Sequence, residues 1–198
     1  MSKVTWDTTI TLDGYTTGVN QSLERPFGDN FGEDLHDWQF KDRDANLRAV
    51  EQIVEAGAYI MGRNMFSPGR GAWDLDWKGW WGDDPVYHAP VFVLTHHPRD
   101  PVEMEGGTTY HFVTDGIESA LAQARAAAGD RTVSIAGGAN TARQYLAAGL
   151  IDEVRLHIVP KVVGAGERPF DGVGDIELEQ VESWATDLVT HITYRPVR

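Results

Sequence analysis

The stretch from Ser134 to Thr141 carries the clearest chemical signal in this chain, because an apolar strand there runs directly into two glycines and a helix start. Gly137 and Gly138 have no Cβ, so a phosphate group can come close to their backbone. The first N–H groups of a helix have no partner within it and attract anions. We therefore expect an anion cradle made of Gly137, Gly138, Ala139, Asn140 and Thr141.

Two further predicted strand ends carry polar residues of kinds that bind phosphate. Apolar runs at 58–61 and 91–94 are typical of buried strands, and each passes directly into polar residues. In chain order, these residues are Gly62, Arg63, Asn64, Thr95 and His96. Three strand ends with such groups indicate a dinucleotide held along one edge of a sheet.

The composition limits the partners and the chemistry. The 198 residues carry a formal net charge of −13, so the general attraction for nucleic acid or an anionic membrane surface is missing. An anionic cofactor then needs local cations, which Arg63, His96, His97 and Arg99 can supply. The absence of cysteine excludes disulfides, a thiol nucleophile and cysteine-ligated zinc, and the histidines are too scattered to indicate a metal site.

Length and patterning predict one α/β domain, residues 1–198, with a sheet that is parallel in the middle and antiparallel at its C-terminal end. Strands are expected over 3–11, 58–61, 91–95, 110–113, 132–136 and 154–158, and an antiparallel pair over 176–184 and 188–194. Predicted helix N-caps are Asp42 or Asp44, and Asp115. No apolar run is long enough for a membrane span or a signal peptide, so we expect a cytoplasmic protein.

Two long segments lie outside these elements. Residues 14–32 form a glycine-rich polar loop, and residues 67–90 form an irregular stretch that holds four of the seven tryptophans. So long a loop inside a compact domain is usually functional or disordered, and the tryptophans argue against disorder. They either cover a core edge or a subunit interface, or line a substrate pocket.

Several short motifs then occur in a characteristic order and spacing. They are Thr11-Leu12-Asp13-Gly14, Met61-Gly62-Arg63, Pro90 to Thr95, Ala136-Gly137-Gly138-Ala139, Leu146 to Glu153, Leu156 to Pro160 and Gly164-Ala165-Gly166. With these motifs the chain resembles the dihydrofolate-reductase-like superfamily, and within it the reductase domain of riboflavin biosynthesis (RibD C-terminal type) and its stand-alone bacterial relatives. The resemblance implies a three-layer α/β fold with helices on both sides of a mixed, mostly parallel sheet, and a homodimer.

The resemblance also implies NADPH as the cofactor, lying across the carboxyl ends of the strands. Residues 62–64 would lie near the adenosine phosphates, 95–96 beside the adenine ribose, and 137–141 around the pyrophosphate. The peptide between the two glycines of the cradle is often cis in this superfamily. One departure is Met65, which stands where the pattern commonly has a threonine, so one hydroxyl group is lost for phosphate binding.

Three aspartates are candidate proton sources for a reductase. Asp13 follows the first predicted strand, where the nicotinamide is expected, although it could instead support the turn at Gly14. Asp34 and Asp37 resemble the helix acid that folate reductases use against the pterin ring. Candidate walls for a flat substrate, which could equally pack in the core, are Trp38, Phe66 and Trp81.

The leading interpretation is therefore an NADPH-dependent reductase of a small heterocyclic, ribityl-like or pterin-like substrate. We do not expect the bifunctional riboflavin enzyme, because this chain has no cysteine and therefore no zinc deaminase half. The alternative is a non-catalytic protein that binds a nucleotide, flavin or other small molecule on the same fold. His157 and His191, both within predicted strands, are not candidate catalysts.

Overall fold

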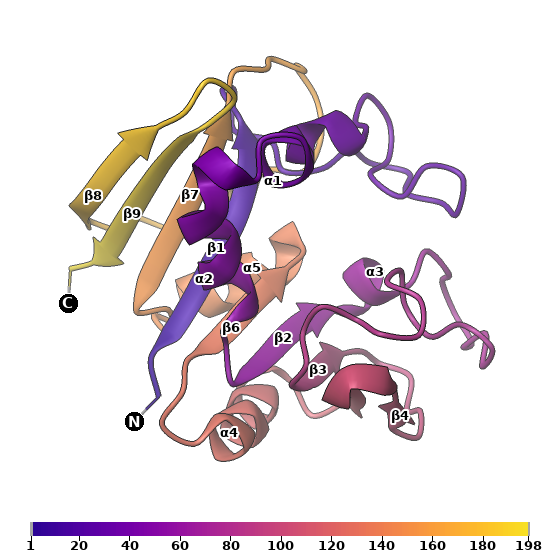
Figure 1. Cartoon of the computed structure of the whole chain (residues 1–198). Coiled ribbons are helices and arrows are strands. Elements are labelled where there is room, and N and C mark those ends of the chain that lie inside the picture. The colour runs from indigo at the N-terminus through magenta and orange to yellow at the C-terminus, as the bar shows by residue number, and fades with distance from the viewer. Residues whose placement is uncertain (1, 198) are drawn as a thin grey trace.

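The computed structural model describes residues 2–197, whose strands form one nine-stranded sheet (Figure 1). Its strands are β1 (Val4–Thr11), β2 (Ala58–Gly62), β3 (Pro90–Leu94), β4 (Val102–Glu103), β5 (Thr109–Val113), β6 (Val133–Gly137), β7 (Glu153–Val159), β8 (Leu178–Ala185) and β9 (Thr190–Pro196). Their order is β4-β5-β3-β2-β6-β1-β7-β9-β8. The strands from β5 to β7 run parallel, whereas β4, β9 and β8 pair antiparallel. The predicted mixed α/β sheet with an antiparallel C-terminal hairpin is confirmed, and β4 is an addition.

Helices cover both faces of the sheet. They are α1 (Asp37–Phe40), α2 (Leu47–Val54), α3 (Arg63–Phe66), α4 (Ile117–Ala128) and α5 (Ala139–Ala147), with 3-10 turns at Glu33–His36, Asp44–Asn46 and Glu105–Gly107. Side chains alternate along the strands, so Ile60 packs on one face with α4 and α5, while Tyr59 packs on the other with α3. This is the layered arrangement that the family resemblance implied.

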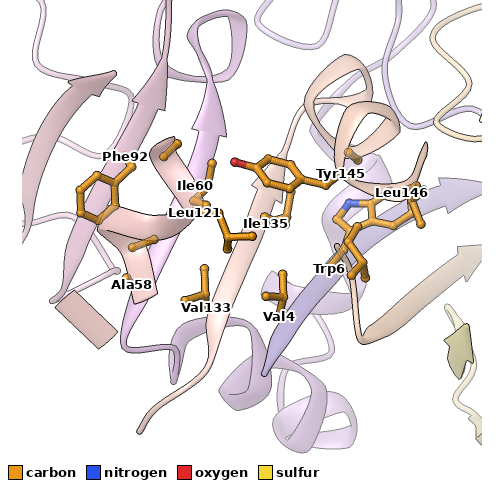
Figure 2. Packing of buried hydrophobic residues seen from close by; sticks show 14 of the residues in the cluster. Val4, Trp6, Ala58, Ile60, Phe92, Leu121, Val133, Ile135, Tyr145 and Leu146 are labelled. Carbon is orange, nitrogen blue, oxygen red and sulfur yellow. The ribbon is translucent and has the colours of Figure 1, made fainter. Parts of the chain in front are cut away.

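The face under α4 and α5 holds the largest apolar cluster (Figure 2). Trp6, Val133 and Ile135 from the central strands are all at most 1 % exposed. Tyr145 of α5 is fully buried there, and its hydroxyl donates to the Ile117 carbonyl oxygen at 2.8 Å. Burial raises the pKa of the Tyr145 phenol, so it stays a neutral donor. The bond joins α5 to the start of α4.

The tryptophan-rich segment 67–90 is folded against the opposite face. Trp73 and Trp77 pack on the cluster that contains Phe66, and the Trp77 indole donates to the Phe66 carbonyl oxygen at 2.8 Å. Trp80 donates in the same way to the Met65 carbonyl oxygen at 3.0 Å. Of the predicted alternatives, the packing of Trp73 and Trp77 fits a covered core edge.

The helix starts differ from those predicted. The N-cap of α4 is Gly116, whose φ of +90° suits glycine, so Asp115 lies one residue too early to cap the helix. The N-cap of α2 is Asn46 in place of Asp42 or Asp44, and no side chain makes a cap hydrogen bond there. Both predicted caps were wrong: the backbone turns at Gly116 before α4, and Asn46 is held by tertiary contacts at the start of α2.

A buried chain of polar side chains explains the position of Asn46. Its amide nitrogen donates to the carbonyl oxygens of Trp38 and Asp42 at 3.2 and 2.7 Å, so its side-chain oxygen is an acceptor. That oxygen lies 2.9 Å from His191 Nε2, which must then carry the proton. A neutral His191 accepts at Nδ1, and His157 Nδ1 lies 2.7 Å away as the donor. These bonds join β7 and β9 to the start of α2.

Two histidines, His36 and His191, have lowered pKa values. Burial, followed by the charge of His157, lowers the pKa of His36 to about 4 and that of His191 to about 3. An unfolded histidine has a pKa of about 6.5, so below that pH these two histidines bind protons in the unfolded chain and stay neutral in the folded chain. The stability that these two groups contribute is therefore complete above about pH 6.5 and is lost as the pH falls toward 4.

We predict that the free energy of unfolding falls steadily between about pH 6.5 and 4.5, mostly above the range in which ordinary carboxylates titrate. Urea unfolding at half-unit pH steps measures this. In the His36→Gln variant the slope should be shallower, because one titrating group is gone. A wild-type free energy that does not change over this range would contradict the assignment.

Candidate functional site

The ends of the parallel strands bring the predicted cofactor residues to one edge of the sheet. β6 lies between β2 and β1, and Met61 of β2 is paired with Gly137 of β6. Gly62 and Gly137 thus end neighbouring strands, from which α3 and α5 start (Figure 1). Thr95 comes directly after β3, the other neighbour of β2.

The predicted cradle has the backbone geometry of an anion site. The peptide bond between Gly137 and Gly138 is cis, as the resemblance implied, and Gly137 has a φ of +126°. Gly138 is the N-cap of the nine-residue α5, and a Cβ built on Gly138 would meet no atom within 4 Å. Open space therefore lies beside Gly138 at the start of a helix, where free N–H groups are expected. A phosphate fits this position.

A close contact between α5 and β2 sets the width of this cradle. A Cβ added to Gly62 would lie 2.4 Å from the Thr141 hydroxyl oxygen, which is nearer than atoms can approach. Thr141 is buried, so its hydroxyl has little room to move. The φ of Gly62 is −80°, which any residue could adopt. Glycine is therefore needed at this position because a side chain would not fit, and not because of the backbone conformation.

Arg63 and Asn64 lie at the start of α3. The Arg63 guanidinium carbon is 3.9 Å from the centre of the Trp73 ring, and its Nη2 donates to the Ala72 carbonyl oxygen at 3.4 Å. Burial, and then the charge of Arg70, lowers the pKa of Arg63. Asn64 is exposed. A guanidinium with spare donors therefore lies directly next to Gly62.

The residues after β3 form a tight turn. Thr95 is buried, and its hydroxyl accepts a hydrogen bond from the His97 backbone N–H at 3.1 Å. Its own N–H donates to the Val113 carbonyl oxygen at 3.0 Å. His96, between them, is exposed. The Thr95 side chain thus shapes the turn, and His96 is the member of this pair that is open to a ligand.

Asp13 anchors a distant loop. Its carboxylate accepts hydrogen bonds from the Thr11 hydroxyl at 2.7 Å, the Val163 N–H at 3.1 Å and the Gly164 N–H at 2.7 Å. The Thr11 bond is the main reason why the pKa of Asp13 is lowered. The carboxylate joins the end of β1 to the loop after β7, whereas the sequence suggested support for Gly14 or a proton source.

The other two predicted acids are paired with lysines. Asp34 lies 2.6 Å from Lys161 Nζ, and this hydrogen bond lowers the pKa of Asp34. Asp37 lies 2.8 Å from Lys41 Nζ, four residues further along the chain. Within residues 2–197, no hydrogen bond or ion pair joins these two carboxylates to each other or to Asp13.

Two of the three predicted substrate walls are core residues. Trp38 and Phe66 are each 1 % exposed, and the Trp38 indole donates to the Thr9 hydroxyl at 3.2 Å. Rings enclosed in this way cannot present a face to a ligand, so their burial does not support the predicted role. Trp81 is 45 % exposed, and its indole donates to the Tyr87 hydroxyl at 3.3 Å. It is the one member of the set that a ligand can reach.

Sequence reasoning missed the contact between the loop 14–32 and the loop after β7. The Glu167 carbonyl oxygen accepts a hydrogen bond from the Thr16 N–H at 3.0 Å, and the Glu167 N–H donates to the Thr17 carbonyl oxygen at 2.7 Å. The Glu167 carboxylate also lies 3.3 Å from Arg143 of α5. A Cβ on Gly166 would lie 2.5 Å from the Thr17 oxygen, so the glycine was the available signal. The loops and the cradle helix are thus one connected unit.

Two surface depressions lie away from this edge. One of about 540 Å³ is lined by Leu75, Val102 and the residues 98–101. A second of about 320 Å³ lies between the end of α5 and the C-terminal segment. Arg99, one of the four predicted local cations, lines the first, and no other predicted cofactor, substrate or catalytic residue lines either of them.

The strand order, the helices on both faces and the glycine cradle between β6 and α5 define a reductase fold of the dihydrofolate-reductase-like class. The chain belongs to the RibD C-terminal domain family, whose family model matches residues 2–192. A search of curated proteins finds no relative. Among residues 2–197, no helix has the length and apolar composition needed to cross a membrane.

Solved structures share this fold at low sequence identity. A Shewanella sp. PV-4 protein described as a riboflavin biosynthesis protein is 22% identical, with a TM-score of 0.66 over 100% of both chains. Dihydrofolate reductase from Enterococcus faecalis, solved with NADP(H), is 12% identical, with a TM-score of 0.60 over 99% of this chain and 97% of that one. RibD from Acinetobacter baumannii is 15% identical, with a TM-score of 0.59; all of this chain matches 58% of that protein.

We predict that Gly62→Ala lowers the free energy of unfolding by about 1–3 kcal/mol, because the new methyl group overlaps the Thr141 hydroxyl. The Thr141 Cβ would lie at an ordinary 3.7 Å. Adding Thr141→Ala should therefore restore most of the lost stability. Urea unfolding of both single variants and the double variant tests the contact, and a double variant no more stable than Gly62→Ala would contradict it.

We also predict that Asp13→Asn loosens the loop after β7. One amide group cannot replace two carboxylate oxygens that accept from three donors, so the N–H groups of Val163 and Gly164 lose partners. Limited proteolysis should cut within residues 160–170 faster than in the wild-type protein. Cleavage at an unchanged rate would show that the carboxylate does not hold this loop.

Proposed function

We propose that this protein is an NADPH-dependent reductase that transfers hydride to a small heterocyclic, ribityl-like or pterin-like substrate. The observation that carries the proposal is the open glycine cradle at the start of α5, with the donor-rich Arg63 at the end of the neighbouring strand. The family membership and the NADP(H) complex of the Enterococcus faecalis enzyme support the same reading.

Each strand end has a proposed part in holding the dinucleotide. The backbone of residues 137–141 would bind the pyrophosphate, and residues 62–64 would bind the adenosine phosphates. Residues 95–96 would lie beside the adenine ribose. Met65 offers no hydroxyl group, so this part of the site depends on backbone N–H groups and on Arg63. When bound, NADPH supplies the hydride, and the chain supplies orientation.

The proton is proposed to come from water at this open edge. A carboxyl group whose pKa is lowered is a poor proton donor at neutral pH, which weighs against Asp13 and Asp34. Both are placed instead to hold the loops around the site. Asp37, half-buried and paired with Lys41, is the remaining acid that could orient the water. Trp81 is the proposed contact for the flat substrate.

The second candidate function is a non-catalytic protein that binds a nucleotide, a flavin or another small molecule. The engagement of Asp13 and Asp34 favours it, because a binder needs no acid free to act. NADPH oxidation with any pyrimidine or pterin acceptor would exclude this candidate. The homodimer expected from the resemblance stays a prediction.

Calorimetric titration of the protein with NADPH, NADH and FMN tests the proposal. Gly138→Ala fills the open side of the cradle without touching another atom, so NADPH should bind at least about tenfold more weakly while the melting temperature stays within about 2 °C. The matched control is Gly69→Ala in the loop after α3, where the nearest atom to the new methyl group is 3.4 Å away.

The outcomes separate the candidates. NADPH binding that only the cradle variant weakens supports the cofactor site, and NADPH oxidation with a pyrimidine or pterin acceptor then supports the reductase over the non-catalytic candidate. Binding of FMN alone supports the second candidate. An NADPH affinity that is equal in the wild-type protein and in Gly138→Ala would show that the cradle does not hold the cofactor.

A further inference from the structure

Arg63 carries a charge that no acidic side chain neutralises. The chain has 30 acidic and 17 basic residues, yet among residues 2–197 no carboxylate lies within 4.0 Å of this guanidinium. Its Nε is buried and makes no hydrogen bond, and its one bond to the Ala72 oxygen is long at 3.4 Å. A guanidinium has five N–H donors, so with the buried Nε set aside and one Nη2 donor used, the remaining Nη donors of Arg63 are left for an anion from outside the chain.

Trp73 supplies the surface on which this guanidinium rests. The distance of 3.9 Å between the guanidinium carbon and the ring centre is well within the range of a cation–π contact. The ring itself is fixed, because its indole nitrogen donates to the His97 carbonyl oxygen at 2.8 Å. Edge-on contacts with Phe66 and Phe112, at 5.8 and 5.1 Å between ring centres, hold it from the sides.

These contacts join two of the predicted cofactor segments. Arg63 follows β2, and His97 follows β3 and donates to the Thr95 hydroxyl. Trp73 bridges the two strand ends from the segment 67–90. The same ring therefore sets the position of the arginine relative to the turn after β3.

Arg99 packs near the same ring but is tied to backbone oxygens of this chain, although its buried Nη1 makes no hydrogen bond. Its guanidinium carbon is 5.5 Å from the Trp73 ring, and its Nη2 donates to the carbonyl oxygens of Leu75 and Trp77 at 2.9 and 2.8 Å. It therefore holds the backbone of the segment that presents Trp73. Arg63 has no comparable duty within the chain.

Resting on the proposed function, we propose that Trp73 is a positioning residue for dinucleotide binding. The indole holds the Arg63 guanidinium flat at the end of β2, so that its spare donors are ready for a phosphate group of the cofactor. The segment 67–90 thus contributes to cofactor affinity through Arg63, without a contact of its own. This role goes beyond covering the core edge.

Calorimetric titration of four variants with NADPH tests this role: Trp73→Leu, Trp73→Phe, Arg63→Ala and the double variant Trp73→Leu with Arg63→Ala. Trp73→Leu should weaken binding about fivefold to twentyfold, because the cation–π contact is lost. Trp73→Phe keeps an aromatic face and should stay within about threefold of the wild-type affinity. The double variant should bind like Arg63→Ala alone, since Trp73 acts through that residue.

Salt dependence gives a readout that a purely structural role would not change. A guanidinium–phosphate contact weakens as salt rises, so Arg63→Ala and Trp73→Leu should both flatten the dependence of affinity on salt concentration. The matched control is Trp77→Leu, the same change in the same segment at a ring that packs on Trp80 and donates to the Phe66 carbonyl oxygen. Its affinity and its salt dependence should remain those of the wild-type protein.

Four results would overturn the proposal: wild-type affinity in Trp73→Leu, losses that multiply in the double variant, an unchanged salt dependence in Trp73→Leu, or an equal loss in Trp77→Leu. A wild-type protein that binds no dinucleotide would overturn the proposed function, and this inference with it. That result is distinct from a wild-type protein that binds NADPH and a Trp73→Leu variant that binds it equally well.

Discussion

The site depends on one steric constraint, the close approach of α5 to the end of β2. The Thr141 hydroxyl occupies the space where a side chain at Gly62 would lie, so the helix can start within reach of the neighbouring strand end. The burial of Tyr145 and its bond to Ile117 hold α5 in this position from the other side. With the helix fixed, Gly138 faces open space at its N-terminus, and Arg63 begins α3 beside it. The cradle is therefore a product of packing as much as of glycine.

Charge is distributed unevenly around this edge. The Asp13 carboxylate already accepts hydrogen bonds, and it joins the end of β1 to the loop after β7. The Asp34 carboxylate is paired with Lys161, which follows β7. Arg63 is a base with an aromatic ring beneath it and no acid beside it. In a chain with a net charge of −13, such a local excess of donors is what an anionic cofactor requires. The acids stabilise the loops, and the arginine stays open for a ligand.

The sequence predicted what depends on local pattern and missed what depends on distant contacts. Strand ends, the two glycines and the antiparallel C-terminal pair follow from alternation and from turn residues, and the structure has them. The bonds of Asp13 reach 150 residues along the chain to Val163, and the His157–His191 pair joins two strands 34 residues apart. No local pattern contains such pairings. The sequence left Trp38 open between a substrate wall and the core for the same reason, because its burial depends on Thr9 and on both histidines.

The most direct test of the cradle is a map of backbone amide shifts on addition of NADPH, measured by two-dimensional ¹⁵N–¹H NMR. We predict that the largest changes fall on residues 138–141 and on the Arg63 amide, with smaller changes in the residues after β3. Large changes confined to the depression around Leu75 and residues 98–101, with none at the start of α5, would contradict this prediction.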